Sequence, residues 1–99
     1  MSFRIHRADA NTKEIVAGLR AAGRSVLMIS SPVPGVPDLL VGYRGIMWLA
    51  DIKKVDAKGR VSAGAASSRV RQAAWAAMWR GGPVHEWTSL EQALAATEG

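Results

Sequence analysis

The chain has 99 residues, of which 48% are hydrophobic, so it predicts one globular domain over residues 1–99 and excludes a disordered or fibrous chain. Thirteen Lys and Arg residues against eight Asp and Glu give a formal net charge of +5. This balance is found in nucleic-acid-binding proteins and also in ordinary basic domains. The absence of cysteine excludes disulfides, Cys-ligated zinc and thiol catalysis, and is consistent with a cytoplasmic location.

Hydrophobic periodicity and turn residues predict seven elements in the order α-β-β-β-α-β-α. The apolar runs are too short to cross a bilayer, so we expect no membrane partner. An α/β fold with a mixed sheet flanked by helices would bury the apolar faces. The expected segments are a helix over 12–22, a strand over 26–29, a proline-rich loop over 30–37, strands over 39–43 and 46–53, a flexible basic loop over 56–68, a helix over 69–79, a strand over 84–87 and a helix over 90–96.

Turn and cap residues set the boundaries of these elements. Asn11 is a good N-cap for the first helix, with Glu14 at the capping-box position, and Gly23 is a typical stop after its end. Arg44-Gly45 predicts a short turn between two strands that pair as an antiparallel hairpin. Thr88 or Ser89 is expected to cap the last helix, with Glu91 in its first turn.

Pro37-Asp38 and Asp51-Ile52-Lys53 form the most informative motif in the chain. Alternation along a strand places residues 51 and 53 on one face and Ile52 on the other, toward the core. Asp38 begins the partner strand of the predicted hairpin. Since antiparallel pairing brings the start of one strand beside the end of the next, Asp38 is expected near Asp51 and Lys53. The alternative is that Asp38 merely begins a strand while Asp51 and Lys53 form a surface ion pair.

Two carboxylates and one lysine in this arrangement suit phosphodiester hydrolysis. Carboxylates are the oxygen ligands that Mg²⁺ or Mn²⁺ prefers, and the Ile52 carbonyl could be a further ligand. A divalent ion stabilises the charge that develops on the phosphate and activates water. The Lys53 ammonium could orient that water or accept its proton. The motif therefore predicts a metal-dependent nuclease.

The chain resembles a virus-type replication-repair nuclease (VRR-NUC) domain of the PD-(D/E)xK superfamily, over about residues 7–96. The likeness rests on the element order and on the segments 11–14, 35–38 and 51–53 and Gln72 followed by Trp75. It implies a restriction-endonuclease-like fold and Mg²⁺-dependent cleavage of branched or flapped DNA, often by a homodimer. The chain departs from the family where Asp51 replaces the more usual Glu, and where the loop before the second long helix is mostly Ala, Gly and Ser.

The resemblance also implies roles for Glu14 and Gln72. Glu14 would be linked to the metal, through water, but its place in a capping box is a competing role. Gln72 would face the site, or would be only a polar position on an amphipathic helix. Positive residues that follow the motif are expected to contact the DNA backbone. They are Lys54, Lys58, Arg60, Arg69 and Arg71.

Two rival functions remain open at the level of the sequence. A binding module that keeps the fold without activity would hold branched DNA through shape and charge, although the intact motif argues against it. An RNA-cleaving relative, or a subunit active only within a larger complex, would carry the same motif.

Overall fold

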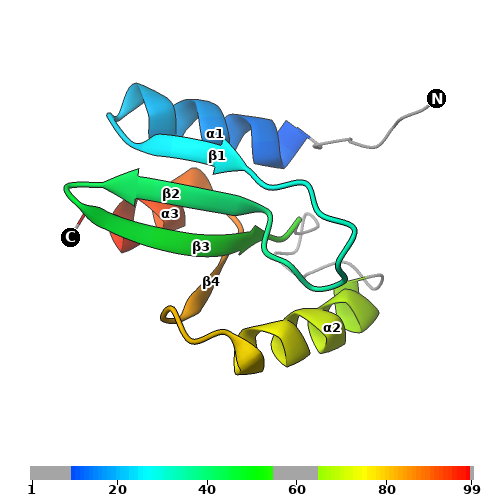
Figure 1. The fold of residues 1–99 in the computed structure, drawn as a ribbon. Coiled ribbons are helices and arrows are strands. Elements are labelled where there is room, and N and C mark those ends of the chain that lie inside the picture. Colours follow the sequence, from blue (N-terminus) through cyan, green and yellow to red (C-terminus); the bar gives the residue numbers. More distant parts are fainter. Residues whose placement is uncertain (1–9, 55–64, 99) are drawn as a thin grey trace.

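A computed structural model describes residues 10–54 and 65–98. The predicted α/β fold and its element order are confirmed (Figure 1). The elements are α1 (Ala10–Ala21), β1 (Ser25–Met28), β2 (Leu39–Tyr43), β3 (Ile46–Ile52), α2 (Ala65–Met78), β4 (Val84–Trp87) and α3 (Leu90–Ala96).

The four strands form one mixed sheet in the order β1-β2-β3-β4. The first three strands pair antiparallel as a meander, whereas β3 and β4 pair parallel across the connection that contains α2. Arg44 and Gly45 both have positive φ, at 55° and 80°, which is typical of the tight hairpin turn that the sequence predicts. This turn fixes the register Leu39↔Ala50 and so decides which residues of the two strands meet.

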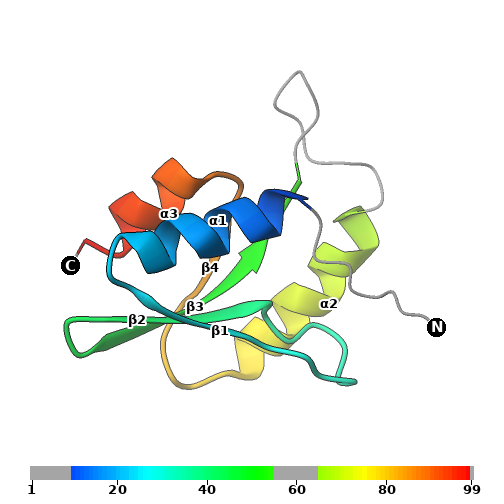
Figure 2. The ribbon, with the colours of Figure 1, turned by 90° about the horizontal axis from the view of Figure 1, so that it is seen from above.

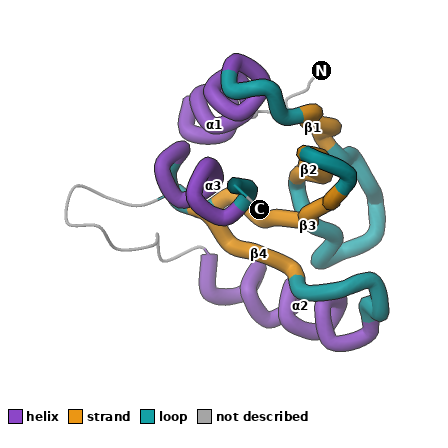
Figure 3. The backbone as a smooth tube through the Cα atoms, turned by 90° about the vertical axis from the view of Figure 1, so that its left-hand side faces the viewer, coloured by secondary structure: helices purple, strands orange, loops and turns teal. Residues whose placement is uncertain are grey.

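The sheet is covered by helices on both faces. α1 and α3 lie side by side on one face and contact each other, as Figures 2 and 3 show, while α2 lies on the other face. The main core lies beneath α1 and α3. It consists of Ile15, Val16, Leu19, Leu39, Val41, Ala50, Trp87 and Ala93. Among the described residues, no helix is long and apolar enough to cross a membrane.

The N-terminal boundary of α1 differs from the prediction. The helix begins at Ala10, so Asn11 lies inside it and the predicted N-cap and capping box were wrong. The Asn11 side chain instead donates hydrogen bonds to the carbonyl oxygens of Lys53, at 3.0 Å, and Thr88, at 3.4 Å. Asn11 therefore ties the start of α1 to the end of β3 and to the segment that follows β4.

The C-terminal end of α1 follows the prediction more closely. Gly23 has a φ of 88°, and its N–H donates to the Arg20 carbonyl while that of Arg24 donates to the Leu19 carbonyl. These two bonds form a Schellman motif, which satisfies carbonyls that the helix end would leave unpaired. The Arg24 side chain is buried, donates to the Thr97 hydroxyl at 3.0 Å and lies 3.9 Å over the Tyr43 ring. This residue links the end of α3 to the sheet.

Helix α2 begins four residues earlier than predicted. Residues 65–68, expected to be loop, are helical. Alanine has the highest helix propensity of all residues, so an Ala-rich stretch without apolar periodicity can still form the first turn. The rest of the predicted loop, residues 56–64, lies outside the described residues. The predicted bounds of β2, β4 and α3 agree with the structure, and Ser89 is the α3 N-cap.

Candidate active site

Asp51, near the end of β3, and Lys53, the residue that follows this strand, lie on the face of the sheet that α2 covers. Both side chains are buried, with exposed fractions of 4% and 5%. Ile52 points to the opposite face and packs against the core beneath α1 and α3. This arrangement follows from the alternation of side chains along a strand, as the sequence predicts.

Asp38 lies immediately before β2 and meets the end of β3. Continuing the register from Leu39↔Ala50 places Asp38 opposite Asp51. The Asp38 N–H donates to the Ala50 carbonyl at 3.1 Å, and Asp38 Oδ2 accepts a hydrogen bond from the Ile52 N–H at 2.9 Å. The side chain of Asp38 is therefore anchored to the backbone between Asp51 and Lys53, although the residue is exposed to solvent.

The surroundings of the Asp51 carboxyl group disfavour its charged form. Burial raises its pKa to about 7, the carboxylates of Asp38 and Glu86 add to the rise, and the Lys53 ammonium opposes it. Asp51 Oδ1 is buried and has no hydrogen-bond partner among the described residues. A buried carboxylate oxygen without a partner is costly, and a bound cation would remove that cost.

Lys53 is fixed at both its backbone and its side chain. Its N–H donates to the Trp87 carbonyl at 2.9 Å, and its own carbonyl accepts from the Asn11 side chain. Its Nζ donates a hydrogen bond to Oε1 of Gln72, which is on α2. Gln72 therefore faces the candidate site, and the ammonium of Lys53 has a defined position close enough to Asp51 to lower the pKa of that carboxyl.

Two residues at the site were missed by the sequence reasoning. Glu86 on β4 is the register partner of Asp51 in the parallel pair, and its carboxylate contributes to the raised Asp51 pKa. Asn11 was assigned to a helix cap. One feature of the sequence could have indicated Glu86. It precedes an apolar Trp87 in a short strand, and alternation along the strand places these two side chains on opposite faces of the sheet. No local pattern identifies Asn11, because its partners are 42 and 77 residues away.

The remaining predicted site residues lie in different surroundings. Glu14 is exposed on α1, and it does not join Asp38 and Asp51 in a group of three carboxylates. Lys54 and Arg71 are exposed, as the proposed DNA contacts require. Arg69 forms an ion pair with Glu86 at 2.8 Å, which the sequence did not predict. Lys58 and Arg60 lie outside the described residues.

The donor set suits a small divalent cation. Within residues 10–54 and 65–98, no three His, Cys, Asp or Glu side chains lie close enough together to hold a metal. A pair of carboxylates is nevertheless a common protein share of a Mg²⁺ site, since this ion keeps several waters or substrate oxygens. The unpartnered Oδ1 of Asp51 is the observation that fits such an ion. Asp38, Asp51 and the Ile52 carbonyl are the groups that would hold it.

One comparison with known proteins, the comparison with solved structures, supports the likeness to a nuclease domain. No family model and no curated protein matches the chain. A solved structure described as a VRR_NUC domain matches with a TM-score of 0.57 and 25% sequence identity, over 88% of this chain and 91% of the other. The likeness predicted from the sequence is therefore confirmed at the level of the structure. In its fold, and along nearly its whole length, the chain is similar to a VRR-NUC domain, and this likeness implies a nuclease of the PD-(D/E)xK type.

Proposed function

We propose that the chain is a Mg²⁺- or Mn²⁺-dependent endonuclease that hydrolyses DNA phosphodiesters, with a preference for branched or flapped DNA such as four-way junctions. The observation that carries the proposal is the buried Asp51 carboxylate, whose Oδ1 has no hydrogen-bond partner among the described residues, together with the buried Lys53 directly after β3. The preference for branched DNA, and action as a homodimer, rest on the resemblance to VRR-NUC domains.

Each residue of the site has a distinct task in this proposal. Asp38 and Asp51 hold the cation, which when bound supplies charge stabilisation at the phosphate and lowers the pKa of water. Asp38 keeps its orientation through the Ile52 N–H. Lys53, held by Gln72, would donate hydrogen bonds from its ammonium to the attacking water and to a phosphate oxygen. Glu14 remains a proposed outer participant that would act through water.

The net charge of +5 supports a polyanionic substrate. We propose that Lys54, Lys58, Arg60 and Arg71 follow the DNA backbone beyond the catalytic residues. Because phosphate contacts release counterions, the affinity for duplex should fall with salt at a slope of about −0.9 per neutralised phosphate. Such contacts fix the position of the duplex without reading its sequence.

A cleavage assay with separate arms tests the proposal. Labelled four-way junction, flap, duplex and RNA substrates are incubated with Mg²⁺, Mn²⁺ or EDTA. We expect metal-dependent cutting of DNA by the wild type and none by Asp51→Asn or Asp38→Asn. Glu98→Gln, an exposed carboxylate away from the site, is the matched control and should cut normally.

The same assay separates the rival functions. Full cleavage in EDTA would refute the metal-dependent mechanism. Binding of junctions without cleavage under any metal would support an inactive structure-selective binding module. Preferential cutting of RNA would support the RNA-cleaving alternative, in which Asp38, Asp51 and Lys53 would have the same roles.

A further inference from the structure

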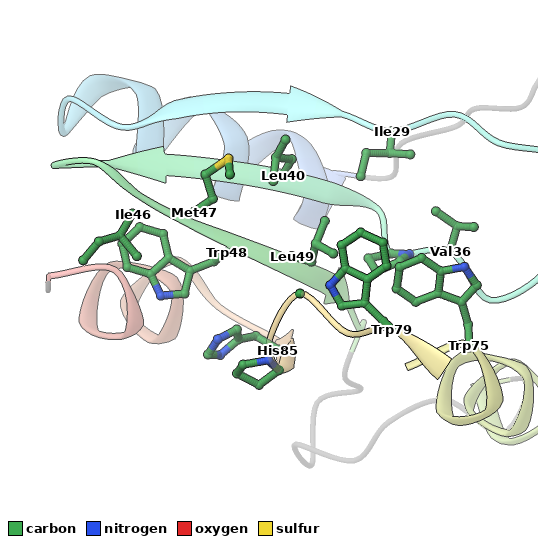
Figure 4. A pocket seen from close by; sticks show the side chains of 13 residues that line it. Ile29, Val36, Leu40, Ile46, Met47, Trp48, Leu49, Trp75, Trp79 and His85 are labelled. Carbon is green, nitrogen blue, oxygen red and sulfur yellow. The ribbon is translucent and has the colours of Figure 1, made fainter. Parts of the chain in front are cut away.

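Helix α2 carries Gln72, yet close packing does not hold its C-terminal half against the sheet. Trp75 and Trp79 stack on each other, with centroids 5.0 Å apart, and line a cavity of about 680 Å³ beneath them. Figure 4 shows the two indole rings across this cavity from side chains of β2 and β3, Leu40 and Leu49 among them. Because the cavity is open, contacts outside it must fix the position of α2 over the site. One is the close approach of Gly35 to the backbone of Arg71 and to Trp75, and another lies nearer the start of the helix.

The N-terminal half of α2 has such a contact. Arg69 donates two hydrogen bonds to the Glu86 carboxylate, from Nη2 at 2.8 Å and from Nε at 3.2 Å. This two-point geometry defines both distance and orientation. Glu86 is the β4 residue that pairs with Asp51 in the sheet. The ion pair therefore anchors α2 to the strand directly beside the candidate metal ligand.

Arg69 and Gln72 are three residues apart and share one face of the helix. A fixed Arg69 therefore fixes the direction of Gln72, whose Oε1 accepts the hydrogen bond from Lys53 Nζ. The backbone of Lys53 is held independently by Trp87 and Asn11. Only the ammonium end of the side chain depends on where α2 lies.

We propose that Arg69 and Glu86 are a positioning pair that sets α2 so that Gln72 holds the Lys53 ammonium in its working position. This inference rests on the proposed nuclease function and assigns Arg69 a different role from the DNA contact that its charge suggests. The side chains of the pair are 47% and 40% exposed, and ion pairs this exposed contribute little to global stability. Their loss should therefore alter the position of α2 rather than the fold.

The two roles for Arg69 predict opposite effects of Glu86→Gln. If Arg69 binds phosphate, removing its protein partner frees it, and the affinity for DNA should rise. If the pair positions α2, Glu86→Gln and Arg69→Gln should each lower kcat about two- to fivefold, the population shift that an exposed ion pair can produce, with KM unchanged. The double variant should be no slower than Glu86→Gln, because Glu86→Gln already removes the ion pair together with the charge beside Asp51.

The experiment measures kcat and KM for both single variants and the double variant, and repeats them in a Gln72→Ala background. In the Gln72→Ala background, loss of the Arg69–Glu86 pair should not lower kcat further, because the Gln72 oxygen that accepts from Lys53 is already absent. Arg80→Gln, which removes an exposed charge just beyond α2, is the control and should leave kcat unchanged. Tighter DNA binding by Glu86→Gln, a raised KM with a flatter salt slope for Arg69→Gln, or multiplicative losses in the double variant would overturn the proposal.

A second measurement is independent of cleavage. Amide hydrogen exchange in α2, from Gln72 to Met78, should be faster in Arg69→Gln and Glu86→Gln than in the wild type and Arg80→Gln. Unchanged exchange would overturn the positioning role even in a chain that cuts DNA. If the two variants exchange faster but the wild type does not cut DNA, the positioning of α2 by the pair stands and only the proposed nuclease function is refuted.

Discussion

Asp51→Asn should make the metal-free protein more stable at alkaline pH while abolishing its activity. Burial raises the Asp51 pKa from its ordinary value of 3.8 to about 7. Between these two values the folded carboxyl binds more protons than the unfolded one, so stability falls as pH rises from about 4 to about 7 and is level above that. Asparagine has the same shape and does not titrate, so the variant should lack this fall.

The expected size follows from the shift in pKa. Since a tenfold change in proton affinity corresponds to about 1.4 kcal/mol, the ionised Asp51 should cost the folded state about 4 kcal/mol at pH 8. The Asn amide would also be buried without a full set of partners, which costs about 1–3 kcal/mol. We therefore expect a net gain of about 1–3 kcal/mol for Asp51→Asn at pH 8 in EDTA.

Urea unfolding followed by tryptophan fluorescence at pH 5, 6, 7 and 8 measures this effect, with Glu98→Gln as the carboxylate-to-amide control. Addition of Mg²⁺ should stabilise the wild type by about 2.7 kcal/mol at a hundred times the Kd and leave Asp51→Asn unchanged. The reasoning would be refuted if the free energy of unfolding of the wild type and of Asp51→Asn changed in parallel with pH in EDTA. It would also be refuted if Asp51→Asn were less stable than the wild type at pH 8.

Three further predictions concern other parts of the molecule. Lys53→Ala should lower the cleavage rate at least about a hundredfold while the Kd for DNA changes a few-fold, and a rate near wild type would contradict its catalytic role. Gly35→Ala should lower the free energy of unfolding in urea by more than about 2 kcal/mol, because φ is 88° and a Cβ would lie 2.3 Å from the Arg71 carbonyl oxygen. Gly45→Ala, where φ is 80° and the space around a Cβ is open, should lower it by about 1 kcal/mol. Equal losses for the two variants would contradict the close contact at Gly35. Arg24→Met should lower stability by about 2–3 kcal/mol through lost buried charged hydrogen bonds and leave kcat unchanged, so a loss of kcat at full stability would show a role beyond the fold.

The sequence predicted those parts of the fold and site that depend on neighbours along the chain. The hairpin from Leu39 to Ile52 follows from a two-residue turn and strand alternation, and these alone bring Asp38 to Asp51. The Schellman end of α1 follows from Gly23. The start of α2 was missed, because an Ala-rich stretch lacks the periodicity on which the prediction depended.

The remaining contacts of the site could not be predicted, because they are long-range and polar. The pairing of Glu86 with Arg69, and its place beside Asp51, require knowledge that β4 lies parallel to β3. The bonds from Asn11 join α1 to the ends of two strands. A helix cap and an internal anchor use the same side chain, and no local pattern distinguishes them.

The mixed pairing of the sheet separates the site into parts that should assemble at different times during folding. The β1-β2-β3 meander closes through short connections and brings Asp38 and Asp51 together locally. The parallel β3–β4 pair forms only when the chain over residues 53–83 has crossed over, and closing a longer loop costs more entropy and slows folding. Gln72 and Glu86 arrive with that late step. A refolding chain should therefore gain its carboxylate pair before Lys53 is positioned, and should become able to cut only when the crossover is complete.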